Sequence, residues 1–213
     1  MKLSIITISM SNTKMGAVPS FSLLPQMTCP TNAPCYIRGC YMKPLIASRK
    51  NLRESLTKNT YIAMYNPEEI YNQICGWLAM YRPEAFRIHV AGDLFSVGYL
   101  DVWNRIAMKN PAVKFFAFTK QFNVLRNYTT DIKLAKNLSI ILSAWLPDAE
   151  GWLPPDDLRK KFPVAWIVDR EQKLFPIIER YSKSIDGCQG NCETCGLCFS
   201  RKRKDGDIAF AKH

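Results

Sequence analysis

Short apolar runs, separated by helix-like stretches, occupy most of this chain of 213 residues. Four such runs lie at residues 86–90, 114–118, 138–144 and 163–168. Apolar runs of about four to eight residues without strict alternation are typical of strands buried on both faces of a sheet. We therefore expect these four segments to be strands.

The stretches between the runs carry helix signals. Pro67 is followed by two acidic residues and then by apolar residues at helical spacing up to Leu78. This pattern predicts a helix, because proline and acidic side chains favour the first turn. Residues 99–108 predict a second helix.

The N-terminal region predicts a hairpin. Residues 3–8 and 17–24 are strand-like and flank a polar turn at residues 11–16. Strand-like segments on either side of such a turn are typical of paired antiparallel strands. The second strand is expected to run straight into the first cysteine group.

Alternating strands and helices indicate an α/β fold built around a parallel sheet. We expect an incomplete (β/α) barrel of five or six strands, with an open doubly wound sheet as the alternative. In either fold, catalytic and ligand-binding residues lie at the carboxyl ends of the strands. No repeat or long linker divides the chain, so a single α/β domain is expected: the hairpin and first strand in residues 1–28, the β/α core in 29–180, and a cysteine-rich, basic segment in 181–213.

The composition is that of an ordinary globular protein, with 47% hydrophobic and 12% aromatic residues. No apolar stretch reaches the length of about 18 residues that a membrane span needs, and the first residues do not resemble a signal peptide. We therefore expect a cytoplasmic protein without a membrane partner. The net charge of +11 favours an anionic partner such as nucleic acid or a phosphorylated cofactor, although only residues 201–204 form a dense basic run.

The eight cysteines of a chain expected in a reducing compartment point to metal ligation rather than to disulfides. Cys188, Cys192, Cys195 and Cys198 place four thiols within eleven residues. Structural zinc sites usually separate two C-x2-C pairs by a longer stretch, whereas a compact C-x2-C-x2-C run is typical of ferredoxin-like [4Fe-4S] binding. The C-terminal group therefore favours an iron-sulfur cluster, with Zn as the alternative.

A second group, Cys29, Cys35 and Cys40, follows the first predicted strand at the spacing C-x5-C-x4-C. Three thiolates satisfy three irons of a [4Fe-4S] cube and leave the fourth open to a substrate or cofactor. The chain is therefore expected to hold one or two clusters. The alternatives are that these are core or loop cysteines, or that one of them completes a single cluster with the C-terminal group; Cys75, alone on a predicted helix, is expected to be a small buried hydrophobe.

Polar residues at two predicted strand ends are further candidates. Ala91, Gly92 and Asp93 follow the strand at 86–90 and are expected to bind a cofactor, with Asp93 also a catalytic candidate. Thr119 and Lys120 end the next strand, where they would reach an anionic cofactor or substrate. The alternative for Thr119 and Lys120 is a solvated loop.

His89 is the last candidate. On a regular strand it would share a face with Ala91 and lie opposite Ile88 and Val90. It is either a catalytic residue or a satisfied core histidine.

The order of these motifs is similar to the layout of radical S-adenosylmethionine (SAM) enzymes. In those enzymes a three-cysteine loop follows the first strand, and a later strand ends in a small-Gly-acid tripeptide. This chain has Ala91, Gly92 and Asp93 where those enzymes usually have Gly-Gly-Glu, and C-x5-C-x4-C where they have C-x3-C-x2-C. The resemblance implies a radical-SAM-like partial barrel and a SAM site beside the three cysteines, because that tripeptide contacts the SAM amino group in the family.

A closer resemblance covers the chain from about residue 20 to its end. Residues 29–41, 87–96 and 118–120, together with the terminal cysteine group, resemble the phage and prophage family called gene product 88. This resemblance implies a bacteriophage or mobile-element origin, and hence the host bacterial cytoplasm, but no particular reaction.

Two functions are compatible with these predictions. The first is an iron-sulfur enzyme of radical-SAM-like architecture that uses an open iron at the three-cysteine group and a small-molecule cofactor near Gly92 and Asp93. The second is a non-catalytic iron-sulfur or zinc protein that binds nucleic acid or a host protein through its basic surface, with the metal stabilising the fold. They differ in whether the strand ends form a cofactor pocket.

Overall fold

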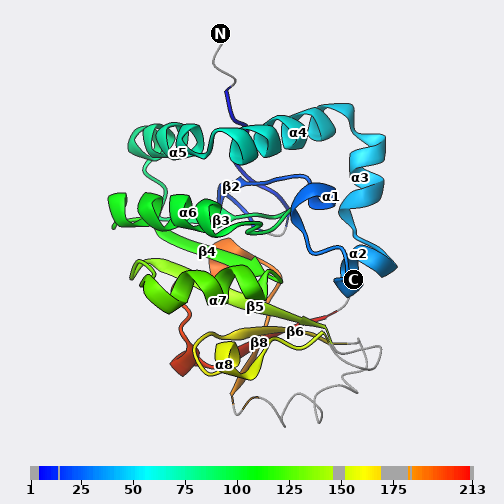
Figure 1. Ribbon diagram of the computed structural model, residues 1–213, viewed down its shortest axis with the longest axis vertical. Helices are drawn as coiled ribbons and strands as arrows, with labels where there is room; N and C mark the ends of the chain where they lie inside the picture. Colours follow the sequence, from blue (N-terminus) through cyan, green and yellow to red (C-terminus); the bar gives the residue numbers. More distant parts are fainter. Residues whose placement is uncertain (1–4, 14, 146–151, 169–181, 183, 212–213) are drawn as a thin grey trace.

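A computed structural model describes residues 5–13, 15–145, 152–168, 182 and 184–211 of the chain. It contains an eight-stranded sheet in the order β1-β2-β3-β4-β5-β6-β8-β7 (Figure 1). The strands are β1 (Ile8–Ser9), β2 (Ser20–Phe21), β3 (Ala85–Ile88), β4 (Lys114–Thr119), β5 (Leu138–Trp145), β6 (Val164–Val168), β7 (Ile185–Gly187) and β8 (Asp207–Ala211). Every neighbouring pair is parallel except β1 and β2. The α/β class and the mostly parallel sheet expected from the sequence are confirmed.

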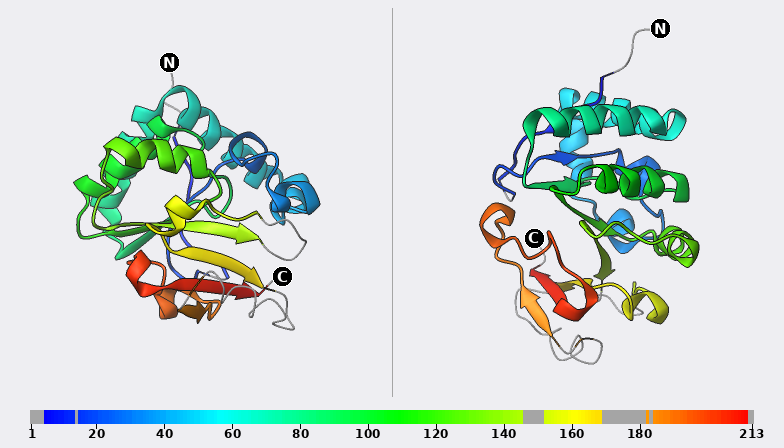
Figure 2. Two further views of the ribbon diagram at one scale, coloured as in Figure 1. Left: turned by 60° about the horizontal axis from the view of Figure 1, so that its bottom comes forward. Right: turned by 90° about the vertical axis from the view of Figure 1, so that its left-hand side faces the viewer.

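The helices connect the strands. They are α1 (Pro25–Thr28), α2 (Pro34–Arg38), α3 (Met42–Ser48), α4 (Lys50–Tyr65), α5 (Pro67–Tyr81), α6 (Val97–Lys109), α7 (Phe122–Asp131), α8 (Asp156–Arg159) and α10 (Cys192–Cys195), with a 3₁₀ turn η1 at Arg203–Asp205. From β2 to β6 the strands follow chain order across the sheet, so successive right-handed crossovers bring their helices to the same face. Figure 2 shows α4 to α8 on this side. The reversal of strand order that defines a doubly wound sheet does not occur between β2 and β6.

Both faces of the central strands are buried, which explains their uninterrupted apolar runs. In β4, Phe115 and Ala117 face the helices, where they join the main core with Trp103 of α6. Phe116 lies on the other face and packs with Met15 and Val18 of the N-terminal turn region. Full burial of one such side chain contributes roughly 1.5–3 kcal/mol.

The C-terminal segment covers this second face of the sheet (Figure 2). Cys192, Cys198 and Phe199 pack against the cluster that contains Phe116. The same segment supplies β7 and β8, which extend the sheet beyond β6. The sequence did not predict these strands within the cysteine-rich, basic segment, because β8 pairs with the distant β6 and β7 pairs in turn with β8.

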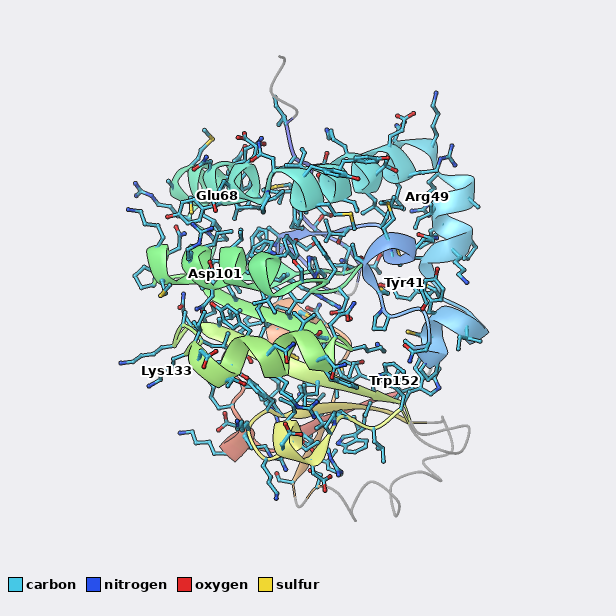
Figure 3. The ribbon with its side chains drawn as sticks, in the orientation of Figure 1. Tyr41, Arg49, Glu68, Asp101, Lys133 and Trp152 are labelled. Carbon is cyan, nitrogen blue, oxygen red and sulfur yellow. The ribbon has the colours of Figure 1, made fainter. Side chains whose placement is uncertain are left out.

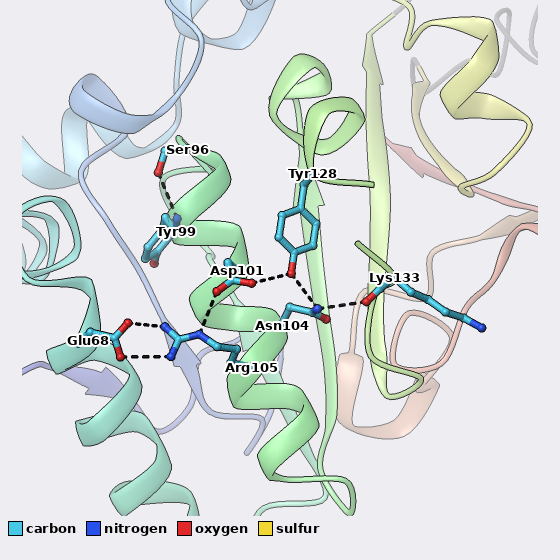
Figure 4. A network of polar contacts seen from close by, with 8 residues as sticks. All are labelled: Glu68, Ser96, Tyr99, Asp101, Asn104, Arg105, Tyr128 and Lys133. Carbon is cyan, nitrogen blue, oxygen red and sulfur yellow. Dashed lines mark hydrogen bonds and ion pairs between the residues drawn. The ribbon is translucent and has the colours of Figure 1, made fainter. Parts of the chain in front are cut away.

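A polar network joins the helices on the first face (Figure 4). Asp101 of α6 accepts hydrogen bonds from Arg105 and from the Tyr128 hydroxyl of α7, at 2.9 and 3.0 Å. Arg105 also pairs with Glu68 of α5. Three consecutive helices are thus held in register by charged and hydroxyl groups at their surface.

The N-terminal hairpin is confirmed, but its strands have only two residues each, with Ile8 opposite Phe21. We expected the second strand to run straight into the cysteines. It does not, because the helix α1 lies between β2 and Cys29. Pro25 begins this turn, since its fixed φ suits the first helical position. Among the described residues, no helix is long and apolar enough to cross a membrane.

Candidate functional site

The carboxyl ends of β2, β3, β4 and β5 meet at one edge of the sheet, and most of the predicted site residues lie there. Cys29 follows β2 through α1, Asp93 follows β3, and Lys120 follows β4. Ser143 lies near the end of β5, where its hydroxyl accepts a hydrogen bond of 2.9 Å from Lys120 Nζ. The structure therefore brings together residues from four strand ends, as parallel topology requires.

Asp93 is the centre of this edge. It is only 4% exposed, and its carboxylate accepts hydrogen bonds from Thr119 Oγ1 at 2.6 Å and from the backbone N–H groups of Leu94 and Lys120 at 2.7 and 2.8 Å. Burial raises the pKa of Asp93, and the hydrogen bond from Thr119 opposes this shift. With three donors on one carboxylate, Asp93 joins the end of β3 to the end of β4.

Gly92 lets this edge approach the segment that leads to Cys29. Its φ of 88° is left-handed, and a Cβ there would lie 2.7 Å from Leu23 Cβ and 2.9 Å from Thr28 Oγ1. The Asp93 N–H reaches Thr28 Oγ1 at 3.3 Å, and Gln121 Nε2 donates to the Thr28 carbonyl at 2.9 Å. The residue immediately before Cys29 is thus bound to two neighbouring strand ends.

The three N-terminal cysteines lie in the segment that follows β2. Cys29 caps α1, Cys35 lies in α2, and Cys40 follows the left-handed Gly39. Burial raises the pKa of Cys29, and Cys35 and Cys40 add to this rise. Tyr41 closes the segment onto the end of β3, because its hydroxyl donates to the Val90 carbonyl at 2.5 Å.

The charge balance at Cys29 favours the neutral thiol in the metal-free protein. Burial raises the pKa of Cys29 well above its usual range, and the neighbouring Asp93 raises it further. Lys120 lowers it, and is the positively charged group on this side of the thiol. Ionisation of Cys29 therefore needs additional positive charge in its surroundings.

The C-terminal cysteines form a separate group on the second face of the sheet. Burial, followed by the nearby Cys192 and Cys188, raises the pKa of Cys198 to about 12. Arg87 opposes this rise. The Asn191 side chain caps α10 by accepting from the N–H groups of the next turn, which fixes the start of the Cys192–Cys195 helix.

All eight cysteines are free thiols in the structure. In the part of the chain that the structure describes, no three cysteine, histidine, aspartate or glutamate side chains form a group that could hold a metal ion. The described cysteines therefore do not form a ready set of ligands for a metal ion in this structure.

His89 lies in the core, away from the thiols. Its φ of 63° breaks strand alternation, so His89 and Ile88 both face the helices, and our expectation of opposite faces was wrong. Nε2 lies 2.9 Å from the Tyr99 hydroxyl, and the two rings stack. Burial lowers the His89 pKa to about 3, which keeps the imidazole neutral at physiological pH.

Several site residues had no signal in the sequence. Thr28 and Ser143 are small polar residues in apolar or mixed segments, and only the fold brings them to Asp93 and Lys120. Arg87 lies within a predicted strand and its guanidinium is 5.7 and 5.3 Å from the ring centroids of Phe116 and Phe118. For Arg87, its charge inside an otherwise apolar predicted strand was the one sequence signal of a special role.

Comparison with known proteins places the chain in a family. It matches the family described as Gene product 88 over residues 6–201. It is also 47% identical over 130 residues to the Gene 88 protein of Mycobacterium phage L5, an alignment that covers 57% of this chain and 53% of that relative. The chain thus spans about half the length of this curated relative. No solved structure matches. The match over most of its length shows that the chain belongs to the gene product 88 family.

Proposed function

We propose that this chain is an iron-sulfur protein in which Cys29, Cys35 and Cys40 hold a [4Fe-4S] cluster at the carboxyl ends of the strands. One iron would remain open to a small-molecule cofactor, with SAM as the candidate that the motif order suggests. The observation that carries the proposal is the junction of strand ends beside Cys29: the Asp93 N–H donates to Thr28 Oγ1, next to Cys29, and the Asp93 carboxylate accepts from the Lys120 N–H.

The chemistry of the donor set fits such a group. Soft thiolates select iron-sulfur clusters and zinc among the common metals. The buried Cys29 thiol lacks the positive charge that its ionised form requires, and a bound iron would supply it. A single zinc ion needs its thiolates within about 4 Å of one another, because Zn–S bonds are about 2.3 Å long. A cube binds its thiolates at separate irons, so its ligands lie farther apart than those of one zinc ion.

The protein residues then have distinct roles. Asp93 positions the strand ends, since three donors already occupy its carboxylate. Lys120 is the group available to offset the negative charge of ligating thiolates or of a cofactor carboxylate. When bound, a [4Fe-4S] cluster supplies one-electron chemistry.

Two further features support the architecture and setting. The consecutive order of β2 to β6, with α4 to α8 on one face, is compatible with the proposed incomplete (β/α) barrel. Free thiols in both cysteine groups suit the reducing cytoplasm of a host bacterium. The C-terminal group would hold a second cluster, or zinc.

Anaerobic purification followed by iron, acid-labile sulfide and zinc analysis tests the proposal. We expect brown protein with thiolate-to-iron absorption near 400 nm. Cys35→Ser should remove the N-terminal share of the iron, Cys195→Ser the C-terminal share, and the control Cys75→Ser neither. SAM added to the reduced protein should change the electron paramagnetic resonance signal that Cys35→Ser removes. Colourless protein with stoichiometric zinc, or iron content unchanged by Cys35→Ser, would overturn it.

A further inference from the structure

A cleft of about 560 Å³ lies at the amino-terminal edge of the sheet. It is lined by residues 129–136 at the end of α7 and after it, by the start of β5, by residues 161–163 just before β6, and by Arg201–Arg203. The three-cysteine group lies at the opposite edge, because all these strands are parallel. Figure 3 labels Tyr41 and Lys133 on opposite sides of the molecule. The cleft is thus separate from the proposed cluster site.

Positive charge dominates the cleft. One acidic residue, Asp131, lines it together with the basic residues Lys133, Lys136, Lys161, Arg201, Lys202 and Arg203. Arg203 is paired with Asp207, and Lys202 Nζ donates to the Leu138 carbonyl at 3.1 Å. Among the described residues, the three exposed lysines at 133, 136 and 161 have no acidic partner.

The floor of the cleft is apolar. Leu138, Ile140 and Phe162 line it, and Phe162 is partly buried against the main core. An apolar and aromatic floor below a cationic rim matches a ligand with both a planar apolar part and phosphate groups.

The rim is held in place before any ligand binds. Asn104 of α6 donates to the Lys133 carbonyl at 3.2 Å and accepts from the Ala135 N–H at 2.7 Å. In Figure 4 the Lys133 side chain points away from this network. On the other side, Ser139 Oγ donates to the Arg201 carbonyl at 2.6 Å, which fixes the basic run against β5. A rigid backbone with projecting lysines lowers the entropy cost of binding.

We infer that this cleft binds nucleoside phosphates, with the lysines at 133, 136 and 161 on the phosphates and Phe162 below a base. Its volume accommodates one or two nucleotides, and a net charge of +11 attracts a polyanion. The ligand is either a single strand of nucleic acid threaded through the cleft or a free nucleotide. This inference does not depend on the proposed cluster.

Fluorescence anisotropy with a short labelled single-stranded DNA, at several salt concentrations, tests it. Lys136→Ala with Lys161→Ala should weaken binding by about tenfold and reduce the slope of log affinity against log salt by about 1.4, since each phosphate contact contributes about 0.7 on single strands. The control pair Lys50→Ala with Lys58→Ala removes the same charge from α4 and should change affinity by less than about twofold.

A competition experiment separates the two ligand sources. ATP that displaces the labelled strand only at millimolar concentration supports a strand, whereas displacement at micromolar concentration supports a free nucleotide. If the double variant at Lys136 and Lys161 (the cleft pair) and the double variant at Lys50 and Lys58 (the α4 pair) weaken DNA binding equally, the inference is overturned, because affinity would then follow total charge. An unchanged salt slope in the cleft pair would overturn it as well. A circular dichroism melt of each pair shows whether it is folded.

Discussion

Replacement of Gly92 by alanine should disturb both stability and the cysteine site. Its backbone has the left-handed φ of 88°, which costs an alanine about 1–2 kcal/mol. The new methyl group would also meet Leu23 Cβ at 2.7 Å and Thr28 Oγ1 at 2.9 Å. To reach an ordinary contact of 3.4 Å, Leu23 must retreat by roughly 0.7 Å, and such overpacking costs about 1–3 kcal/mol. The expected loss of unfolding free energy is therefore about 2–5 kcal/mol.

Urea denaturation of the metal-free, reduced protein measures this loss. Gly76→Ala is the matched control, because Gly76 lies within α5 and a Cβ there meets nothing within 4 Å. We expect Gly76→Ala to stabilise the protein by about 0.5–1 kcal/mol, since alanine has the higher helix propensity. If the unfolding free energy of Gly92→Ala lies within about 0.5 kcal/mol of the parent's, the close approach of the strand end to Thr28 is not a feature of the molecule.

The same variant reports on the proposed site. Thr28 immediately precedes Cys29, so a shift of Thr28 moves the first thiol away from Asp93 and Lys120. Gly92→Ala should therefore retain less iron than Gly76→Ala after anaerobic reconstitution with iron and sulfide. Equal iron content in the two variants would refute this coupling, even if Gly92→Ala were less stable.

Two further predictions concern buried ionisable groups. Burial lowers the His89 pKa to about 3, so on acidification the unfolded chain binds this proton before the folded protein does. The parent should therefore lose up to about 1.4 kcal/mol of unfolding free energy per pH unit below about pH 6.5. His89→Asn should lack this part of the pH dependence in urea titrations at pH 7, 6 and 5. Asp207 is fully buried and accepts from the Val164 N–H and from Trp166 Nε1, at 2.8 and 3.0 Å. Asp207→Asn should cost about 2–4 kcal/mol because its NH2 group faces one of these donors and the ion pair with Arg203 is lost, whereas exposed Asp131→Asn should leave the urea midpoint unchanged.

The periodicity of the sequence predicted β3 to β6, α5 and α6, because buried parallel strands and amphipathic helices have strong local patterns. It did not predict α4, Lys50–Tyr65, which is largely polar. This helix is held by buried polar contacts: Asn59 exchanges hydrogen bonds with the Thr7 backbone, and Thr60 Oγ1 accepts from the Leu24 N–H at 2.8 Å. Such contacts depend on residues distant in the chain and leave no local pattern.

The rule that parallel strands end at one edge predicted that Asp93, Thr119 and Lys120 would lie near Cys29. It could not predict how the Asp93 carboxylate is used, because that depends on which backbone N–H groups face it. A different rule, the alternation of side chains along a strand, failed for His89, since a single left-handed residue changes which face the side chain occupies. Topology therefore places the site residues, while local backbone geometry decides which of them remain available for chemistry.

The C-terminal cysteine group also links the two ends of the chain. The Glu193 carboxylate, within α10, accepts a hydrogen bond of 3.0 Å from the Ala17 N–H, and Gly16 leaves the space that Glu193 occupies. A metal bound by the neighbouring cysteines would hold α10 in place, and through Glu193 it would hold the N-terminal turn against β4. Because binding free energy at such a site is also folding free energy, metal loading of the C-terminal group should stabilise residues more than 170 positions away in sequence.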